Sequence, residues 1–234
     1  MSTFHFKQFA VQNEKSAMKV NTDSVLLGSW AEIPLDAKRG LDIGSGTGIL
    51  ALMIAQRSKE IKITGIEIEK NAFEESKINF ENSPYSNRLK AVNLPLQKFV
   101  SDLKFDCIIT NPPYFENDLK NEDENKKTAR HTDSLSFQEL IKFTENNLSQ
   151  SGRLNLILPF TESEIFRKLA QASSLFLTKI AFIKPNKNKN TNRVLMCFSL
   201  TEETIKEEEF CVYKAPGVYS KEHHELTKDF YLDK

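Results

Sequence analysis

The chain has 234 residues, with 39% apolar residues and 17 phenylalanines, which is enough material for one large domain with a sizeable core. Its 32 basic and 32 acidic side chains cancel, so no overall field draws the protein to nucleic acid or to a membrane, although a local basic patch is compatible with this balance. The chain has three cysteines (Cys107, Cys197 and Cys211) and no C-x-x-C pair, so we expect neither disulfides nor a metal. It shows no signal-peptide core, and no apolar run approaches the roughly 20 residues that span a bilayer, so we expect a cytoplasmic protein.

The first thirty residues contain closely spaced aromatic side chains followed by a helix signal. Phe4, Phe6 and Phe9 stand around Lys7. Their spacing favours an arm that packs on the core, and a lid over a cofactor or an RNA contact is the alternative. An Asn-Thr-Asp run can cap a helix over about 21–30.

A glycine-rich turn comes next, between a short strand at 41–43 and a buried helix at 49–56. Its glycines stand at alternate positions: Gly44, Gly46 and Gly48. A side chain would block such a turn, and a strand, a glycine turn and a helix N-terminus together form a ligand cradle. A dinucleotide motif is Gly-x-Gly-x-x-Gly, so the third glycine here is one residue early. With Asp42 at the strand end, the pattern suits a nucleoside with an amino-acid tail.

Glu67 ends the next predicted strand, at 61–68, and a helix at 70–82 and a strand at 89–92 follow. A carboxylate at this place in a nucleotide-binding α/β fold accepts the ribose hydroxyl protons. The alternative is a solvated acid at a helix start.

The apolar run at 105–110 ends in Asn111-Pro112-Pro113-Tyr114. Consecutive apolar residues indicate a buried strand, and the two prolines stop it. Asn111 is thereby held just past the carboxyl end of a strand, where open parallel sheets bind ligands. A plain strand-to-loop turn is the alternative reading.

The second half alternates helices and strands, after a polar loop at 115–135 that is either solvated or a lid ordered by substrate. The expected elements are a helix at 136–150, a strand at 154–158, a helix at 161–172, strands at 175–183 and 194–200, and an edge strand at 210–213 beyond a solvent-facing acidic segment at 201–209.

A basic loop without acidic residues separates the strands at 175–183 and 194–200, which makes it the tip of a hairpin. Its cations are the best candidates for phosphate contacts: Lys184, Lys187, Lys189 and Arg193. A merely soluble hairpin tip explains them equally well.

Strands that alternate with helices predict a doubly wound α/β fold with a mostly parallel sheet. In a common strand order, the first and fourth strands are neighbours at the point where the winding reverses. The glycine turn and Asn111 would then open into one crevice.

The residues 42–48 and Glu67 resemble the S-adenosylmethionine site of class I methyltransferases, and Asn-Pro-Pro-Tyr resembles the motif of enzymes that methylate a planar amino or amide nitrogen. That motif does not separate adenine N6, guanine N2 and the glutamine amide of release factors. The segments 6–9, 18–28 and 129–131 are similar to the tRNA1(Val) adenine-37 N6-methyltransferase family, and the likeness covers nearly the whole chain.

The resemblance implies a Rossmann-like, seven-stranded methyltransferase domain over 1–234, with an N-terminal arm or lid at 1–30, a core at 31–200 and an edge strand and tail at 201–234. It implies S-adenosylmethionine as cofactor and tRNA as partner, and we expect a monomer. The implied cofactor residues are Asp42, Gly44, Ser45, Gly46, Gly48, Glu67, Leu96 and Asn111. The implied catalytic residues are Asn111, Pro112 and Tyr114, and the RNA contacts are Lys7, Lys19, Arg130, His131, Lys187, Lys189 and Arg193.

Two oxygens, the side-chain carbonyl of Asn111 and the backbone carbonyl of Pro112, are expected to accept the N–H groups of the target amine while Tyr114 stacks on the extruded base. Pro95 stands where many class I enzymes have an acidic residue for the cofactor adenine, so backbone near Leu94 and Leu96, or Gln97, would hold that ring. A glutamine-amide methyltransferase of release factors is the main alternative, although the helical domain typical of those enzymes is missing from this sequence. A cofactor-binding scaffold that holds RNA without modifying it is the other.

Overall fold

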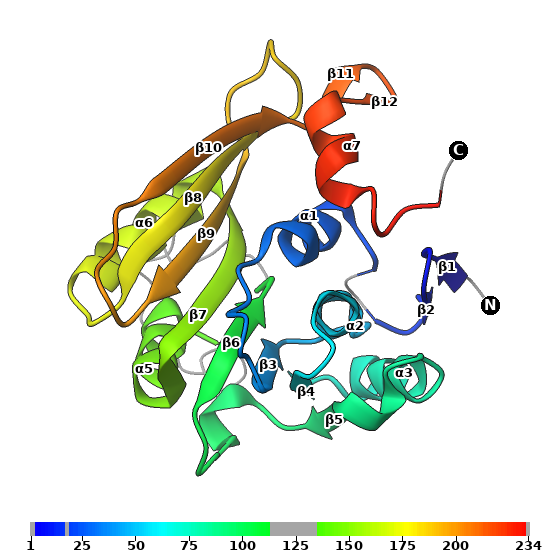
Figure 1. The fold of residues 1–234 in the computed structure, drawn as a ribbon, viewed down its shortest axis with the longest axis vertical. Coiled ribbons are helices and arrows are strands. Elements are labelled where there is room, and N and C mark those ends of the chain that lie inside the picture. The colour runs from blue at the N-terminus through cyan, green and yellow to red at the C-terminus, as the bar shows by residue number, and fades with distance from the viewer. Residues whose placement is uncertain (1–2, 17–18, 113–134, 233–234) are drawn as a thin grey trace, which may run out of the picture.

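A mixed sheet of eight strands forms the centre of the molecule (Figure 1). The computed structural model describes residues 3–16, 19–112 and 135–232. In chain order the strands of the sheet are β3 (Arg39–Ile43), β4 (Lys62–Glu67), β5 (Leu89–Asn93), β6 (Phe105–Thr110), β7 (Leu148–Pro159), β8 (Phe176–Lys184), β9 (Arg193–Ser199) and β10 (Lys206–Cys211). Their order in space is β10-β8-β9-β7-β6-β3-β4-β5.

The expected mostly parallel sheet is confirmed, because β9 alone among these strands runs against its neighbours, β7 and β8. β3 and β6 are neighbours, and Ile43 stands beside Thr110. The turns that follow these two strands therefore leave the sheet at the same edge, as the sequence predicts.

The sheet has eight strands rather than the expected seven, because β10 adds to β8. This strand begins at Lys206, inside the acidic segment that was expected to face solvent, and it ends at Cys211. A segment can face solvent and also form a strand at the edge of a sheet, because an edge strand exposes charged side chains while its backbone pairs on one side. Two lysines of β8 pair with its acids: Lys179 with Glu208 at 3.4 Å and Lys184 with Glu209 at 2.6 Å.

Helices cover both faces of the sheet (Figure 1). One face carries α1 (Thr22–Trp30), α2 (Ile49–Arg57) and α3 (Lys70–Glu81), and the other carries α5 (Phe137–Asn147) and α6 (Phe160–Gln171). The apolar run of β6 serves both layers, since Cys107 and Ile109 belong to one core and Ile108 to the other. A strand buried on both faces has no polar side to alternate with, which explains its continuous apolar sequence.

Local signals account for the helix starts. The side chain of Asn21 caps α1 by accepting from the backbone of Ser24. Ser136 and Glu139 form a reciprocal capping box at the start of α5. That helix was expected to continue to residue 150, but it ends at Asn147 because the chain already pairs with β6 at Leu148.

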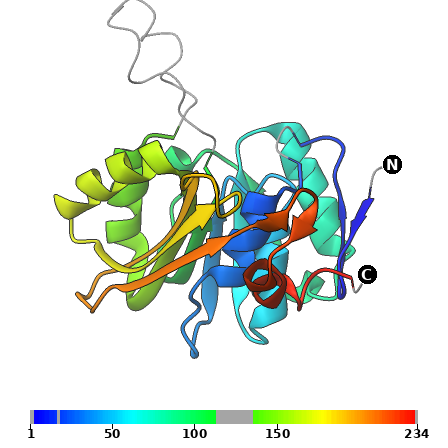
Figure 2. The same cartoon turned by 90° about the horizontal axis from the view of Figure 1, so that it is seen from above.

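The two ends of the described chain lie side by side and carry elements that were not predicted (Figures 1 and 2). These are the hairpin β1 (Thr3–His5) and β2 (Ala10–Gln12), the hairpin β11 (Tyr213–Ala215) and β12 (Val218–Tyr219), and α7 (Lys221–Thr227). Elsewhere in the chain, two 3₁₀ turns, η1 (Ser86–Arg88) and η2 (Leu96–Lys98), lie just before and just after β5. Packing of the N-terminal phenylalanines is confirmed for Phe6 and Phe9, which are buried, while Phe4 is 36% exposed. Phe6 stacks on Tyr231 with 6.0 Å between ring centroids.

Cys107 and Cys197 are buried, as their apolar surroundings predict, and the three cysteines are free thiols. Burial raises the pKa of the Cys107 thiol to about 12, so it behaves as a small apolar side chain. No helix in the described ranges has both the length and the apolar character needed to cross a membrane.

Candidate active site

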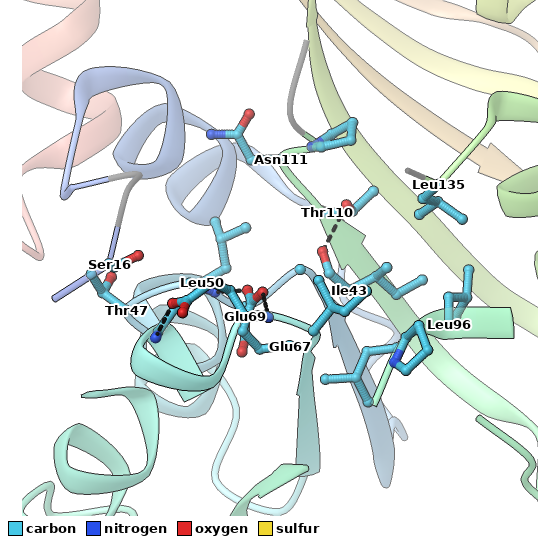
Figure 3. A pocket seen from close by; sticks show the side chains of 18 of the residues that line it. Ser16, Ile43, Thr47, Leu50, Glu67, Glu69, Leu96, Thr110, Asn111 and Leu135 are labelled. Atoms are coloured by element: carbon cyan, nitrogen blue, oxygen red, sulfur yellow. Dashed lines mark hydrogen bonds between the residues drawn. The ribbon is translucent and has the colours of Figure 1, made fainter. Parts of the chain in front are cut away.

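A cavity of about 330 Å³ opens at the edge of the sheet where β3, β4, β5 and β6 end (Figure 3). The turns after these strands line it, together with α1 and the segment before α1. Its walls include Ser16, Lys19, Ser24, Gly44, Ser45, Gly46, Thr47, Glu67, Glu69, Leu94, Pro95, Leu96, Gln97, Thr110, Asn111, Pro112 and Leu135. The predicted crevice between the glycine turn and Asn111 is therefore present.

The glycine turn after β3 depends on left-handed backbone at three positions. Gly44, Gly46 and Gly48 have φ of 69°, 53° and 81°. A Cβ at Gly44 would meet nothing within 4 Å, whereas one at Gly48 would collide with the ring of Phe80. Gly44 therefore keeps a wall of the cavity open, and Gly48, which is not among the lining residues, lets α3 pack against the turn.

Asp42 lies behind the turn rather than in the cavity wall, and it is fully buried. One carboxylate oxygen accepts the backbone N–H of Ala51 at 3.2 Å, and the other has no hydrogen-bond partner in the described structure. Burial, with a smaller repulsion from Glu67, raises the pKa of Asp42 from 3.8 to about 7. Asp42 thus holds the start of α2 against the glycine turn.

Glu67 faces the cavity from the end of β4 and is tied to the glycine turn. Its carboxylate accepts the backbone N–H of Gly46 at 2.8 Å and that of Glu69 at 2.9 Å. Glu69, rather than Glu67, caps α3, through Asn71 and Ala72. A carboxylate oxygen accepts more than one hydrogen bond, so Glu67 keeps acceptor capacity for hydroxyl groups of a ligand.

The wall after β5 is mostly apolar. Leu94 is 37% exposed, and Leu96 is buried against the second core. The side chain of Gln97 donates to Glu139 at 3.1 Å, so it already has an acceptor. A flat apolar ring fits this wall, and the backbone next to Pro95 offers the remaining polar atoms.

Asn111 lies at the top of the cavity and is buried. Its Nδ2 donates to Oγ of Ser24 in α1 at 3.1 Å, and this bond fixes the orientation of the amide. Thr110, just before it, donates to the carbonyl of Ile43 at 2.8 Å and so links β6 to β3. Pro112 also lines the cavity, while Tyr114, Arg130 and His131 lie outside the described residues.

The candidate RNA contacts are not gathered at one place. Lys187 and Lys189 are exposed in the basic loop between β8 and β9. Arg193, at the end of that loop, pairs with Asp23 of α1 at 2.7 Å. Lys7 lies in the N-terminal hairpin, on another side of the molecule from the basic loop, and Lys19 lines the cavity (Figure 1).

Sequence reasoning missed Ser16, Ser24 and Glu69 in the cavity wall, and Glu75, which holds the segment before α1. Glu69 precedes a predicted helix, so its position carried a capping signal. The others make contacts across long stretches of chain, for which a single sequence has no local signal. The described parts of the chain contain no group of three or more His, Cys, Asp or Glu side chains that could hold a metal ion.

The cavity fits a nucleoside cofactor with an amino-acid tail. The hydroxyl of Ser45 is buried in its wall without a hydrogen-bond partner in the described structure, and the open face of Gly44 leaves room for a ligand. An acceptor for hydroxyl groups (Glu67) lies between an apolar wall and the polar turn. These features are the ones that a ring, a ribose and a polar tail require.

Comparison with known proteins agrees with this geometry. The model of the methyltransferase small domain family matches residues 15–171. A tRNA1(Val) (adenine(37)-N6)-methyltransferase of Flavobacterium psychrophilum is 41% identical over 98% of this chain and 99% of its own length. A protein of the same description from Pseudoalteromonas translucida is 43% identical over 99% of both chains.

Solved structures show the same fold at low sequence identity. A predicted O-methyltransferase of Agrobacterium tumefaciens has a TM-score of 0.68 at 17% identity, covering 89% of this chain and 96% of its own. A putative RNA methyltransferase of Pyrococcus horikoshii has a TM-score of 0.55 at 18% identity, covering 80% and 86%. With the fold, the cavity and the full-length relatives in agreement, the chain belongs to the methyltransferase small domain family and, within it, to the tRNA1(Val) (adenine(37)-N6)-methyltransferases.

Proposed function

We propose that the protein transfers a methyl group from S-adenosylmethionine to the exocyclic N6 of an adenine in tRNA, in the cytoplasm, and that this adenine is position 37 of tRNA1(Val). The observation that carries the proposal is the shared cavity of the glycine turn and Asn111. The names of relatives at about 40% identity over their full length supply the substrate.

The cofactor residues fall into four groups by position. Gly44, Ser45 and Gly46 line the cavity beside the proposed tail, and Glu67 accepts the ribose hydroxyls. Leu96 packs on the adenine, while Asp42 and Gly48 shape the turn from behind. When bound, S-adenosylmethionine supplies a methyl group already activated by a positively charged sulfur.

Asn111 and Pro112 hold the target amine. An exocyclic adenine nitrogen is a weak nucleophile because its lone pair is delocalised into the ring. Nδ2 of Asn111 donates to Ser24, and Oδ1 of the same amide is proposed to accept one N–H of the amine. The carbonyl of Pro112 accepts the other, and Tyr114 stacks on the base. Two acceptors localise the lone pair on nitrogen and orient it, and positioning of this kind supplies much of the rate.

Lys187 and Lys189 are the proposed phosphate contacts of the basic loop, because they are exposed and have no ion pair with described residues. Arg193, which pairs with Asp23 of α1 at the end of this loop, is proposed to contact RNA there as well. Lys7, on another side of the molecule, and Arg130 and His131 are proposed as further RNA contacts. Lys19 was expected in this group, but its place in the cavity wall favours another role.

The direct test incubates purified protein and labelled S-adenosylmethionine with bulk tRNA from a strain that lacks the enzyme. Nucleosides are then separated and identified by mass spectrometry. We expect N6-methyladenosine, and its absence refutes the proposal. A second arm uses tRNA1(Val) transcripts with adenine or guanine at position 37, since only the first should accept label.

Replacing Asn111 by Ala should abolish turnover and leave binding of S-adenosylhomocysteine measurable by calorimetry. Asn146→Ala is the matched control, because Asn146 is an exposed residue on α5 that does not line the cavity. Activity that survives in Asn111→Ala contradicts the proposed role of the amide.

A further inference from the structure

The cavity has one cationic side chain among its described lining residues, that of Lys19. Both carboxylates of the wall, Glu67 and Glu69, already accept backbone N–H groups. The side chain of Lys19 has no ion pair and no hydrogen bond with the described residues, and it is exposed to the cavity and to solvent. A zwitterionic tail in this cavity would carry a carboxylate, and Lys19 is the cation available for it.

Lys19 belongs to a segment that is tied down although it has almost no regular structure. We call residues 12–16 and 19–20 the strap. Glu75 of α3 is buried, and its carboxylate accepts three successive backbone N–H groups of the strap: Glu14 at 2.6 Å, Lys15 at 2.8 Å and Ser16 at 2.9 Å. These three donors compensate the buried charge and fix one end of the strap beside the cavity.

Asn79, one helical turn after Glu75, joins the strap to the glycine turn. Its Oδ1 accepts the backbone N–H of Gln12 at 2.7 Å, and its Nδ2 donates to the carbonyl of Gln12 at 3.1 Å. The same Nδ2 donates to the carbonyl of Thr47, in the cavity wall, at 2.8 Å. One buried amide therefore sets the strap relative to the turn that holds the ligand.

The other end of the strap is held as well. Oδ1 of Asn13 accepts the backbone N–H of Val20 at 2.9 Å, and the next residue, Asn21, caps α1. Lys19 thus directly precedes two anchored residues. The hydrogen bonds of these two neighbours place its backbone, while its side chain remains available to a ligand.

The orientation of the cofactor in the proposed function directs its tail toward the strap. The apolar wall for adenine includes Leu96, and Glu67 for the ribose lies in the middle of the cavity. Figure 3 shows Ser16 of the strap and Leu96 at opposite ends of the cavity. A tail that extends from the ribose away from Leu96 therefore reaches the strap.

We propose that the ammonium group of Lys19 pairs with the carboxylate of the cofactor's amino-acid tail, and that the strap exists to place it. This inference rests on the proposed function and deepens it. The strap is a part of the cofactor site that comes from outside the sheet, and Glu75 and Asn79 are positioning residues for it. Lys19 is then a cofactor ligand rather than an RNA contact.

The test compares two ligands that differ by the tail. S-adenosylhomocysteine carries the carboxylate, and 5′-methylthioadenosine has the same ring and ribose but no amino-acid tail. Binding of each is measured by calorimetry to wild type, Lys19→Met and the matched control Lys15→Met. Lys15 is an exposed strap residue that does not line the cavity.

We expect Lys19→Met to weaken the binding of S-adenosylhomocysteine about tenfold or more, because a charge-assisted hydrogen bond is lost. The same change should alter the affinity for methylthioadenosine by less than about twofold. Lys15→Met should change neither. Equal weakening of both ligands overturns the proposal, because it indicates a packing role, and so does no change in either. Wild-type protein that binds neither ligand refutes the proposed function itself, which separates the two failures.

Discussion

Replacing Glu75 by Ala should release the strap while leaving the sheet intact. Glu75 accepts three backbone N–H groups, at 2.6, 2.8 and 2.9 Å. A hydrogen bond to a charged group contributes about 1.5–3 kcal/mol when its donor is buried, and the donor at Ser16 is buried. The bonds from the exposed Glu14 and Lys15 contribute less, because water can replace the carboxylate as acceptor there. A total of about 3 kcal/mol corresponds to a shift of roughly a hundredfold in the opening equilibrium of the strap.

Hydrogen exchange followed by mass spectrometry measures this shift directly. Peptides that contain residues 14–16 should exchange about a hundred times faster in Glu75→Ala than in wild type. Peptides from β3 and β6 should exchange at wild-type rates, because neither strand touches the strap carboxylate. Glu81→Ala is the matched control, since Glu81 is exposed at the end of the same helix. If strap peptides exchange equally in both variants, the three hydrogen bonds do not hold the strap.

Three further changes test other parts of the site. Folding raises the pKa of Asp42 from 3.8 to about 7, so its contribution to stability is fully present below pH 4 and is lost as the pH rises through 7. Between these values the free energy of unfolding of wild type, measured with urea, should fall by up to about 1.4 kcal/mol per pH unit, and Asp42→Asn should lack this fall. Parallel plots of unfolding free energy against pH for the two proteins contradict the shift. Gly48→Ala should lower the stability more than Gly44→Ala does. Left-handed backbone costs about 1–2 kcal/mol in both variants, but only the new side chain at position 48 displaces Phe80. Equal melting temperatures contradict this packing argument. Replacing Lys187 and Lys189 together by alanine should reduce the salt slope of tRNA binding by about one unit per lysine. The control is Lys59→Ala, at an exposed lysine between α2 and β4, and a slope unchanged in the double variant removes the loop from the RNA surface.

Much of the fold follows from local signals that a single sequence displays. Asn21 caps a helix where it was expected to, and the three glycines form the expected turn, in which all three have positive φ. β6 ends at Thr110, directly before Asn111 and Pro112, as the sequence predicts. In each case the determining interaction lies within a few residues, so the pattern is readable without the partner elements.

Elements whose existence depends on distant partners were missed or placed wrongly. α5 ends before its helical periodicity does, because β6 offers Leu148 a backbone partner. β10 has three consecutive glutamates, a poor strand signal, and forms because β8 presents a free edge with lysines. The aromatic packing between Phe6 and Tyr231 joins the two ends of the chain, which no local pattern announces.

The candidate site divides in the same way. Its cradle and its catalytic amide are encoded in contiguous motifs, and the cavity brings both together as the strand order predicts. The strap is held by two side chains of α3, Glu75 and Asn79. In the sequence, Glu75 looks like an ordinary polar position of a helix, and Asn79 looks like a polar residue near a helix end. Their role becomes visible only when the backbone of residues 12–16 is placed against them.

The acidic edge strand has a consequence for the protein in a crowded cell. β10 leaves one row of backbone groups without a neighbour in the sheet, and such an edge invites a second chain to add a strand. Three glutamates, Glu207, Glu208 and Glu209, lie along this edge. Two lysines of the neighbouring strand β8 pair with Glu208 and Glu209, which lowers the repulsion among the acids within one molecule. Two copies that approached edge to edge would bring six carboxylates into register. The same residues that make a weak strand signal thus protect the sheet from aggregation.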